Sequence, residues 1–141
     1  MRQRRERDRS VYAVLIVVVI VLGLGSRKAA PWLPLLLKKN AGDILWALMV
    51  FLLCGWLLRR ASTQAILWIA ALFSISIEFL KLISIPWLDA FRHTTPGWLI
   101  FGQGFHWSNI ACYLIGIGIG TLGELWLLRG AARKAKASSV A

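Results

Sequence analysis

The sequence predicts an all-α polytopic membrane protein in which four transmembrane helices form a small bundle. Of its 141 residues, 58% are hydrophobic, whereas soluble domains contain about 45–50% apolar residues. The mean hydropathy is +0.66, and the apolar residues concentrate in four blocks that approach the length of about 20 residues needed to cross a bilayer. We therefore predict one transmembrane domain over residues 11–128, flanked by basic cytoplasmic tails at residues 1–10 and 129–141.

The first apolar block predicts a helix over residues 11–25. A basic start before an apolar run is also typical of a signal peptide, but no small-residue cleavage site precedes a polar domain, and three more apolar blocks follow. We therefore interpret it as a retained transmembrane helix. Because the block is short for a span, we expect the helix to extend back to Ser10 or forward past Ser26.

The next two blocks predict an antiparallel helical hairpin over residues 43–58 and 64–85. Asp43 is suited to the N-cap of the first of these helices, and Arg59 and Arg60 suit the negative end of its dipole. The turn between the two helices is short, and Pro86 is expected to stop the second one.

The fourth block predicts a helix over residues 108–128. The two long connections each contain a short apolar stretch, at residues 32–37 and 98–101. Both stretches are too short to span a bilayer, and the sequence leaves open whether they lie on its surface or re-enter it.

The distribution of basic residues predicts the orientation. The two tails and the turn at residues 59–63 carry eleven Lys and Arg residues, and the other side carries six. The positive-inside rule therefore places both termini in the cytoplasm. The net charge of +11 is assigned to helix orientation and contact with anionic headgroups rather than to nucleic-acid binding.

Glu78 is the most informative residue for function, because it lies within the third apolar block. A carboxylate at the centre of a spanning helix costs about 2.5–3.5 kcal/mol on insertion scales unless a partner or water relieves it. Glu78 lies 14 residues after Gln64, hence about 21 Å along the helix. Lys81 follows one turn later and is a candidate counter-charge.

Other polar residues are expected at the same depth as Glu78, on the side away from the termini. We predict an outward-facing polar pocket with Arg92 or Lys81 as counter-charge to Glu78, and with Asn109 and Tyr113, which share a helix face, as its wall. An Arg suits phosphate because its planar fork binds two oxygens. The candidate ligand-binding residues are Arg27, Asp43, Glu78, Lys81, Arg92, Asn109 and Tyr113, with Glu78 also the candidate catalytic residue.

Each of these candidates also has a structural interpretation. Glu78 and Lys81 could form only an ion pair, Lys81 could extend to the interface, and Asp43 could act only as a cap. Glu124 is expected at the membrane interface near Arg129. Gly116 and Gly120 have the GxxxG spacing that lets helices approach closely.

No catalytic or metal-binding signature is present. The spacing of His93 and His106 to carboxylates does not favour a metal site, and Cys54 and Cys112 are predicted to be buried thiols without metal-ligand spacing. We predict no metal and no cofactor.

The order of several short motifs resembles a bacterial membrane family catalogued as domain of unknown function 2809. The resemblance covers about residues 15–122 and departs from the family pattern at Lys81, where the family often has Gln, and near Ser108 and Asn109, where it often has Asp. It is carried by residues 25–27, residues 42–47, Glu78, Arg92, Thr94, Thr95, Gly97, Phe101, Gly102, Phe105, Tyr113 and Gly116.

A more distant similarity to the VanZ-like proteins linked to teicoplanin resistance implies a cell-envelope setting. Together the two resemblances imply the bacterial inner membrane, without an assigned reaction.

Three functions follow as hypotheses. The first is binding of an anionic lipid or glycolipid headgroup in the outer leaflet through Arg92, Arg27 and Glu78. The second is an enzyme or proton-coupled transporter in which Glu78 handles protons on a lipid-linked substrate. The third is an accessory subunit, or a homo-oligomer, in which Gly116 and Gly120 pack against a membrane partner.

Overall fold

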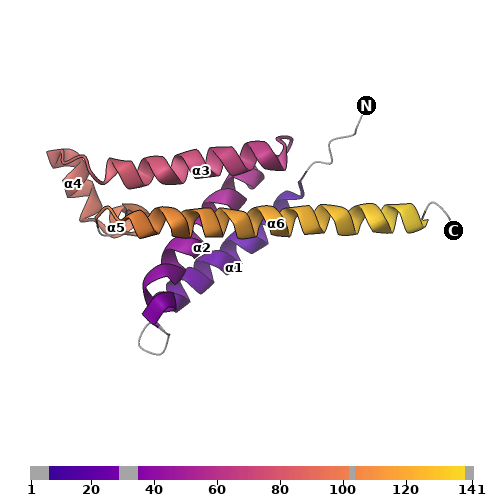
Figure 1. The fold of residues 1–141 in the computed structure, drawn as a ribbon, viewed down its shortest axis with the longest axis horizontal. Helices are drawn as coiled ribbons and strands as arrows, with labels where there is room; N and C mark the ends of the chain where they lie inside the picture. The colour runs from indigo at the N-terminus through magenta and orange to yellow at the C-terminus, as the bar shows by residue number, and fades with distance from the viewer. Residues whose placement is uncertain (1–6, 29–34, 102–103, 139–141) are drawn as a thin grey trace.

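The computed structural model describes residues 7–28, 35–101 and 104–138, and the regular structure in these ranges is entirely helical. Figure 1 shows the arrangement of the elements. The helices are α1 (Arg9–Lys28), α2 (Leu35–Leu57), α3 (Thr63–Leu80), α4 (Pro86–Arg92), α5 (Thr95–Phe101) and α6 (Trp107–Ser138).

The predicted fold class is confirmed. Four helices are long and apolar enough to cross a membrane, and their spanning parts are Arg9–Ser26, Asn40–Leu57, Thr63–Leu80 and Trp107–Gly130. Each has a mean hydropathy of 1.6 or more over its most apolar window. The protein is therefore a polytopic membrane protein whose two short helices, α4 and α5, connect the third span to the fourth.

The first two helices are longer than the sequence predicted. α1 extends the expected 11–25 in both directions, and α2 begins at Leu35 rather than at residue 43. The N-cap prediction for Asp43 is therefore wrong, because Asp43 lies inside α2. The Leu and Lys residues that precede it favour helix, and no proline interrupts them. Of the stretch 32–37, residues 35–37 belong to α2, and residues 32–34 lie outside the described residues.

α3 ends earlier than predicted, at Leu80 rather than at residue 85. The amides of Lys81, Leu82 and Ile83 each bond to the carbonyl three residues earlier, which tightens the last turn. Pro86 then begins α4 instead of stopping α3, in agreement with the preference of proline for the first helical turn.

The last connection and the last helix also differ from the predicted pattern. Residues 98–101 lie in α5, a helix of seven residues that is too short to span. α6 continues ten residues past the expected end at residue 128, so most of the predicted C-terminal tail is helical. At 1.5 Å per residue its 32 residues extend about 48 Å, which is longer than the hydrocarbon core.

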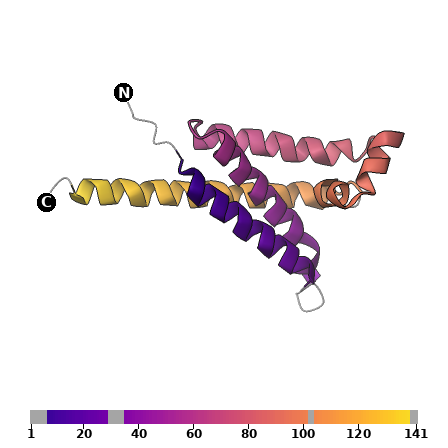
Figure 2. The ribbon, with the colours of Figure 1, turned by 180° about the vertical axis from the view of Figure 1, so that it is seen from behind.

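The four long helices form two layers that cross. α3 and α6 run side by side in both views, and the α1–α2 pair runs obliquely across them. α6 packs against α2 and α3, whereas the main neighbour of α1 is α2. The start of α1, the α2–α3 turn and the C-terminal part of α6 lie on one side, which we call the terminal end. The end of α1, the start of α2, α4 and α5 lie on the other side, which we call the α4–α5 end (Figures 1 and 2).

Two glycines allow α6 to approach α2 closely. A Cβ atom on Gly116 would lie 2.2 Å from the carbonyl oxygen of Ile44, and one on Gly120 would lie 2.5 Å from the Phe51 ring. The contact at Gly116 is with backbone, which cannot move aside as a side chain can. Gly116 and Gly120 thus face α2 of the same chain.

We expect Gly116→Ala to destabilise the fold by about 1–3 kcal/mol, the usual range for an overpacked site. Thermal unfolding of the detergent-purified protein measures the effect. Gly118→Ala is the matched control, because a Cβ atom at that position would have no neighbour within 4 Å. Equal unfolding temperatures of the two variants would contradict the close approach of α6 to Ile44.

Candidate functional site

The Glu78 carboxylate is fully buried and accepts four hydrogen bonds. Oε2 accepts from Lys81 Nζ at 2.5 Å and from the Tyr113 hydroxyl at 2.7 Å. Oε1 accepts from the backbone amide of His106 at 2.9 Å and from Asn109 Nδ2 at 3.2 Å. An ionised carboxylate offers about four lone-pair positions, so the protein itself occupies them all.

The donors to Glu78 come from the end of its own helix and from the start of α6. Asn109 and Tyr113 lie one turn apart on α6, as predicted, and the amide of His106 lies just before that helix. Lys81 is the residue that caps the end of α3, so its side chain turns back to its own helix. That side chain is only 4% exposed, so this lysine does not extend to the interface.

Asp43 and Trp46 border this cluster from α2. The Asp43 charge acts electrostatically on Tyr113 and Cys112, and the Trp46 ring lies 5.3 Å from the Tyr113 ring, centroid to centroid. The structure therefore brings together four of the predicted residues around Tyr113, as a saturated network rather than as an open polar pocket. These four are Asp43, Glu78, Lys81 and Asn109.

Arg92 belongs to a neighbouring pair. Its Nη1 donates to Asp89 at 2.9 Å, its Nη2 donates to the carbonyl oxygen of Leu80, and its guanidinium lies 5.4 Å from the centre of the Phe101 ring. These contacts fasten α4 to the end of α3. Arg92 Nε is buried without a hydrogen-bond partner among the described residues. The Arg27 backbone lies in the last turn of α1, and its side chain lies outside the described ones.

A second buried carboxylate, Glu124, lies at the terminal end. It is 6% exposed and forms an ion pair with Arg7, whereas its predicted depth at the membrane interface stays a prediction. Arg7 donates to Oε1 through Nε at 3.0 Å and through Nη2. Thr63 donates to Oε1 at 2.6 Å, and Tyr12 donates to Oε2 at 2.7 Å.

Arg7 also joins Glu124 to the α2–α3 turn. Its Nη1 donates to the carbonyl oxygens of Leu58, Arg59 and Ala61, at 2.6 Å for Ala61. Burial by itself would lower the pKa of Arg7, but the hydrogen bond and charge of Glu124 outweigh it and raise the pKa. Arg7 therefore stays charged, and it joins the segment before α1 to the α2–α3 turn and to α6.

One signal in the sequence could have located this cluster. Glu124 lies inside an apolar block, which calls for donors at its depth, and the antiparallel topology places Tyr12 and Thr63 at that same end. Sequence spacing does not show which arginine at that end pairs with Glu124, because Arg7 precedes the first helix and reaches Glu124 only in the folded bundle.

Both clusters are closed sites whose polar groups satisfy one another. Their chemistry is suited to joining helices, since a buried carboxylate in hydrocarbon must find donors within the protein. Neither is open to a substrate in this conformation.

We expect Glu78→Gln to cost about 3–5 kcal/mol of stability, because it leaves Lys81 buried without its counter-charge. Thermal unfolding in detergent checks this. The double variant Glu78→Gln, Lys81→Gln should recover part of the loss, since neither charge is then buried alone. A Glu78→Gln protein as stable as the wild type would contradict the ion pair.

We expect Arg7→Lys to loosen the terminal end, because an ammonium group donates from a single point and lacks the planar fork through which the guanidinium reaches both Glu124 and the turn carbonyls. Limited proteolysis of the N-terminal segment should become at least several-fold faster. Arg129→Lys is the matched control, because Arg129 is exposed. Equal cleavage rates in both variants would show that Arg7 does not hold this segment.

Comparison with known proteins identifies a family. A family model described as "Protein of unknown function (DUF2809)" matches residues 32–117, more than half of the chain. The matched range contains the whole Glu78 cluster and Arg92, and it leaves out Arg7, Tyr12 and Glu124 of the second cluster. No solved structure matches. The similarity to VanZ-like proteins stays a prediction. The chain belongs to the DUF2809 family.

Proposed function

We propose that this protein binds an anionic lipid at the α4–α5 end of its bundle. With both termini in the cytoplasm, as the positive-inside rule predicts, that end lies at the outer leaflet of a bacterial inner membrane. The ligand class is a phospholipid or glycolipid with a negatively charged headgroup.

The charge balance at the α4–α5 end is the observation that carries this proposal. Six basic residues and three acidic residues belong to this end by their positions in the chain, an excess of three positive charges. Glu78 is paired with Lys81, and Asp89 is paired with Arg92. This end also contains one further acidic residue, Asp43, and four further basic residues, Arg27, Lys28, Lys38 and Lys39.

These four cations belong to the helix ends nearest the expected headgroup layer. Arg27 and Lys28 end α1, and Lys38 and Lys39 lie in the first turns of α2. A cation near an anionic membrane surface contributes about 1 kcal/mol. An excess of three charges therefore favours an anionic over a neutral headgroup by roughly 3 kcal/mol, or about a hundredfold.

Two predicted binding residues take other roles in this proposal. Glu78 is a positioning residue, because protein donors already occupy its oxygens. Arg92 has a side chain that is 17% exposed and already donates to Asp89 and to the carbonyl oxygen of Leu80, so it is a less available ligand than the four basic residues at the ends of α1 and α2.

A proton-linked activity is the second candidate. It is favoured by the hydroxyl of Tyr113, which donates to Glu78 and experiences the charge of Asp43 from α2. Two carboxylates around one tyrosine could relay a proton. An accessory-subunit role through Gly116 and Gly120 is not favoured, because these glycines pack against α2 of the same chain.

Native mass spectrometry of nanodisc-extracted protein with phosphatidylglycerol or phosphatidylcholine tests the proposal. We expect wild type to retain phosphatidylglycerol at least tenfold more strongly. Changing Lys28, Lys38 and Lys39 to Ala should remove that preference, and high salt should weaken it.

The matched control for this experiment changes Arg129, Arg133 and Lys134 to Ala, which removes the same charge from α6. It should keep the preference for phosphatidylglycerol. Equal retention of both lipids by the wild type, or equal losses in the two triple variants, would overturn headgroup binding at the α4–α5 end. A proton-linked role would then be tested by proton flux in Tyr113→Phe vesicles.

A further inference from the structure

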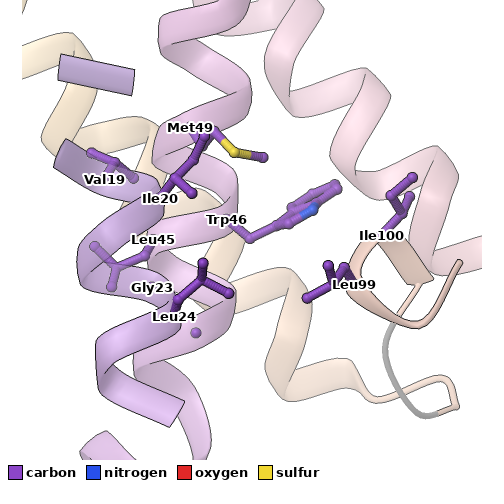
Figure 3. A pocket seen from close by; sticks show the side chains of 10 residues that line it. Val19, Ile20, Gly23, Leu24, Leu45, Trp46, Met49, Leu99 and Ile100 are labelled. Atoms are coloured by element: carbon purple, nitrogen blue, oxygen red, sulfur yellow. The ribbon is translucent and has the colours of Figure 1, made fainter. Parts of the chain in front are cut away.

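An apolar groove lies between α1, α2 and α5, away from both carboxylate clusters. Its volume is about 280 Å³. Figure 3 shows side chains from all three helices around it, with the Trp46 indole extending toward Leu99 and Ile100 of α5. The lining residues are Val19, Ile20, Gly23, Leu24, Gly42, Leu45, Trp46, Met49, Leu99 and Ile100.

We infer that this groove holds one acyl chain of the anionic lipid, an inference that rests on the proposed function. Its α1 and α2 walls belong to the spanning segments Arg9–Ser26 and Asn40–Leu57, so the medium around it is hydrocarbon. Its lining side chains offer no charge and, apart from the Trp46 N–H, no strong hydrogen-bonding group. A hydrocarbon chain suits this apolar lining within the membrane-spanning segments.

The position of the groove relative to the cations supports the same lipid. Lys28 follows Leu24 by four residues, and Lys38 precedes Gly42 by four residues. Four residues correspond to about 6 Å along a helix axis. In this inference the phosphate lies at the ends of α1 and α2, about one helical turn beyond Leu24 and Gly42 of the groove lining, and its chain continues into the groove.

The basic residues and the apolar groove contribute differently to the binding free energy of the lipid. A chain that leaves bilayer hydrocarbon gains no hydrophobic free energy, so only packing contributes in the groove. The cations therefore set the preference for an anionic headgroup, and the groove sets which chain is held and where. Trp46 forms a wall of the groove and also stacks against Phe73 and contacts Tyr113, so chain occupancy fixes a side chain that borders the Glu78 cluster.

A photo-crosslinking experiment tests the groove. Phosphatidylglycerol with a diazirine in the middle of one acyl chain is reconstituted with the full chain, and crosslinked peptides are mapped by mass spectrometry. We expect crosslinks concentrated on Met49, Leu99 and Ile100. Gly23→Leu should fill the groove and reduce these crosslinks at least fivefold, because a Cβ on Gly23 has its nearest neighbour at 4.0 Å and the added side chain has room to enter.

Gly25→Leu is the matched control, because a Cβ atom there would have no neighbour within 4 Å and Gly25 does not line the groove. Ile100→Trp fills the groove from α5 and serves if Gly23→Leu fails to fold. Crosslinks spread evenly over the exposed apolar faces, or unchanged in both filled variants, would overturn the inference. So would loss of a dimer in light scattering of Gly23→Leu, which would assign the groove to a second copy.

Crosslinking with phosphatidylglycerol and with phosphatidylcholine tests the groove and the headgroup site independently. If the groove crosslinks form equally with phosphatidylcholine, the headgroup preference fails and the chain site holds. If phosphatidylglycerol is preferred but its crosslinks avoid the groove, the headgroup proposal holds and the chain site fails.

Discussion

A carboxylate inside hydrocarbon must have its hydrogen-bond donors supplied by the protein, and this requirement organises the bundle. Glu78 on α3 takes two of its four donors from side chains of α6, and Glu124 on α6 takes donors from α1, from α3 and from the segment before α1. The two clusters lie toward opposite ends of the membrane-spanning part of α6 and fix its position against α3. The close approach of α6 to α2 at Gly116 then places Trp46 against Tyr113.

Because the hydrogen bonds of both carboxylates are made within the protein, neither carboxylate has an open position for a ligand in this structure. Lys81, Asn109 and Tyr113 all donate to Glu78, so the residue that first suggested a ligand site has its hydrogen bonds within the protein. Two other features are peripheral to these clusters. There is an excess of basic residues at the ends of α1 and α2, and there is an apolar groove between α1, α2 and α5. These features lie next to each other, and the anionic lipid that we propose would contact both.

The α4–α5 connection illustrates how a short, loop-like segment becomes part of this arrangement. A Cβ on Gly97 would lie 1.9 Å from the Phe91 carbonyl oxygen, so glycine is required where α5 turns back against α4. Arg92 stacks on Phe101 and bonds to Leu80 and Asp89, which holds both short helices against the end of α3. α5 is thereby positioned so that Leu99 and Ile100 complete the groove.

The sequence by itself determined the membrane class, the four spans, and Lys81 as one of two candidate counter-charges to Glu78, because hydropathy and helical periodicity are local properties. It also predicted that Asn109 and Tyr113 share a face. It did not determine the helix ends at Leu35, Leu80 and Ser138, since helix ends depend on the last few hydrogen bonds and on packing as well as on composition. Only the tertiary structure decided that Arg92 pairs with Asp89 and that Arg7 reaches Glu124. Partner choice among several basic residues depends on how helices cross and where a non-helical segment folds back, and neither is encoded in spacing along one helix.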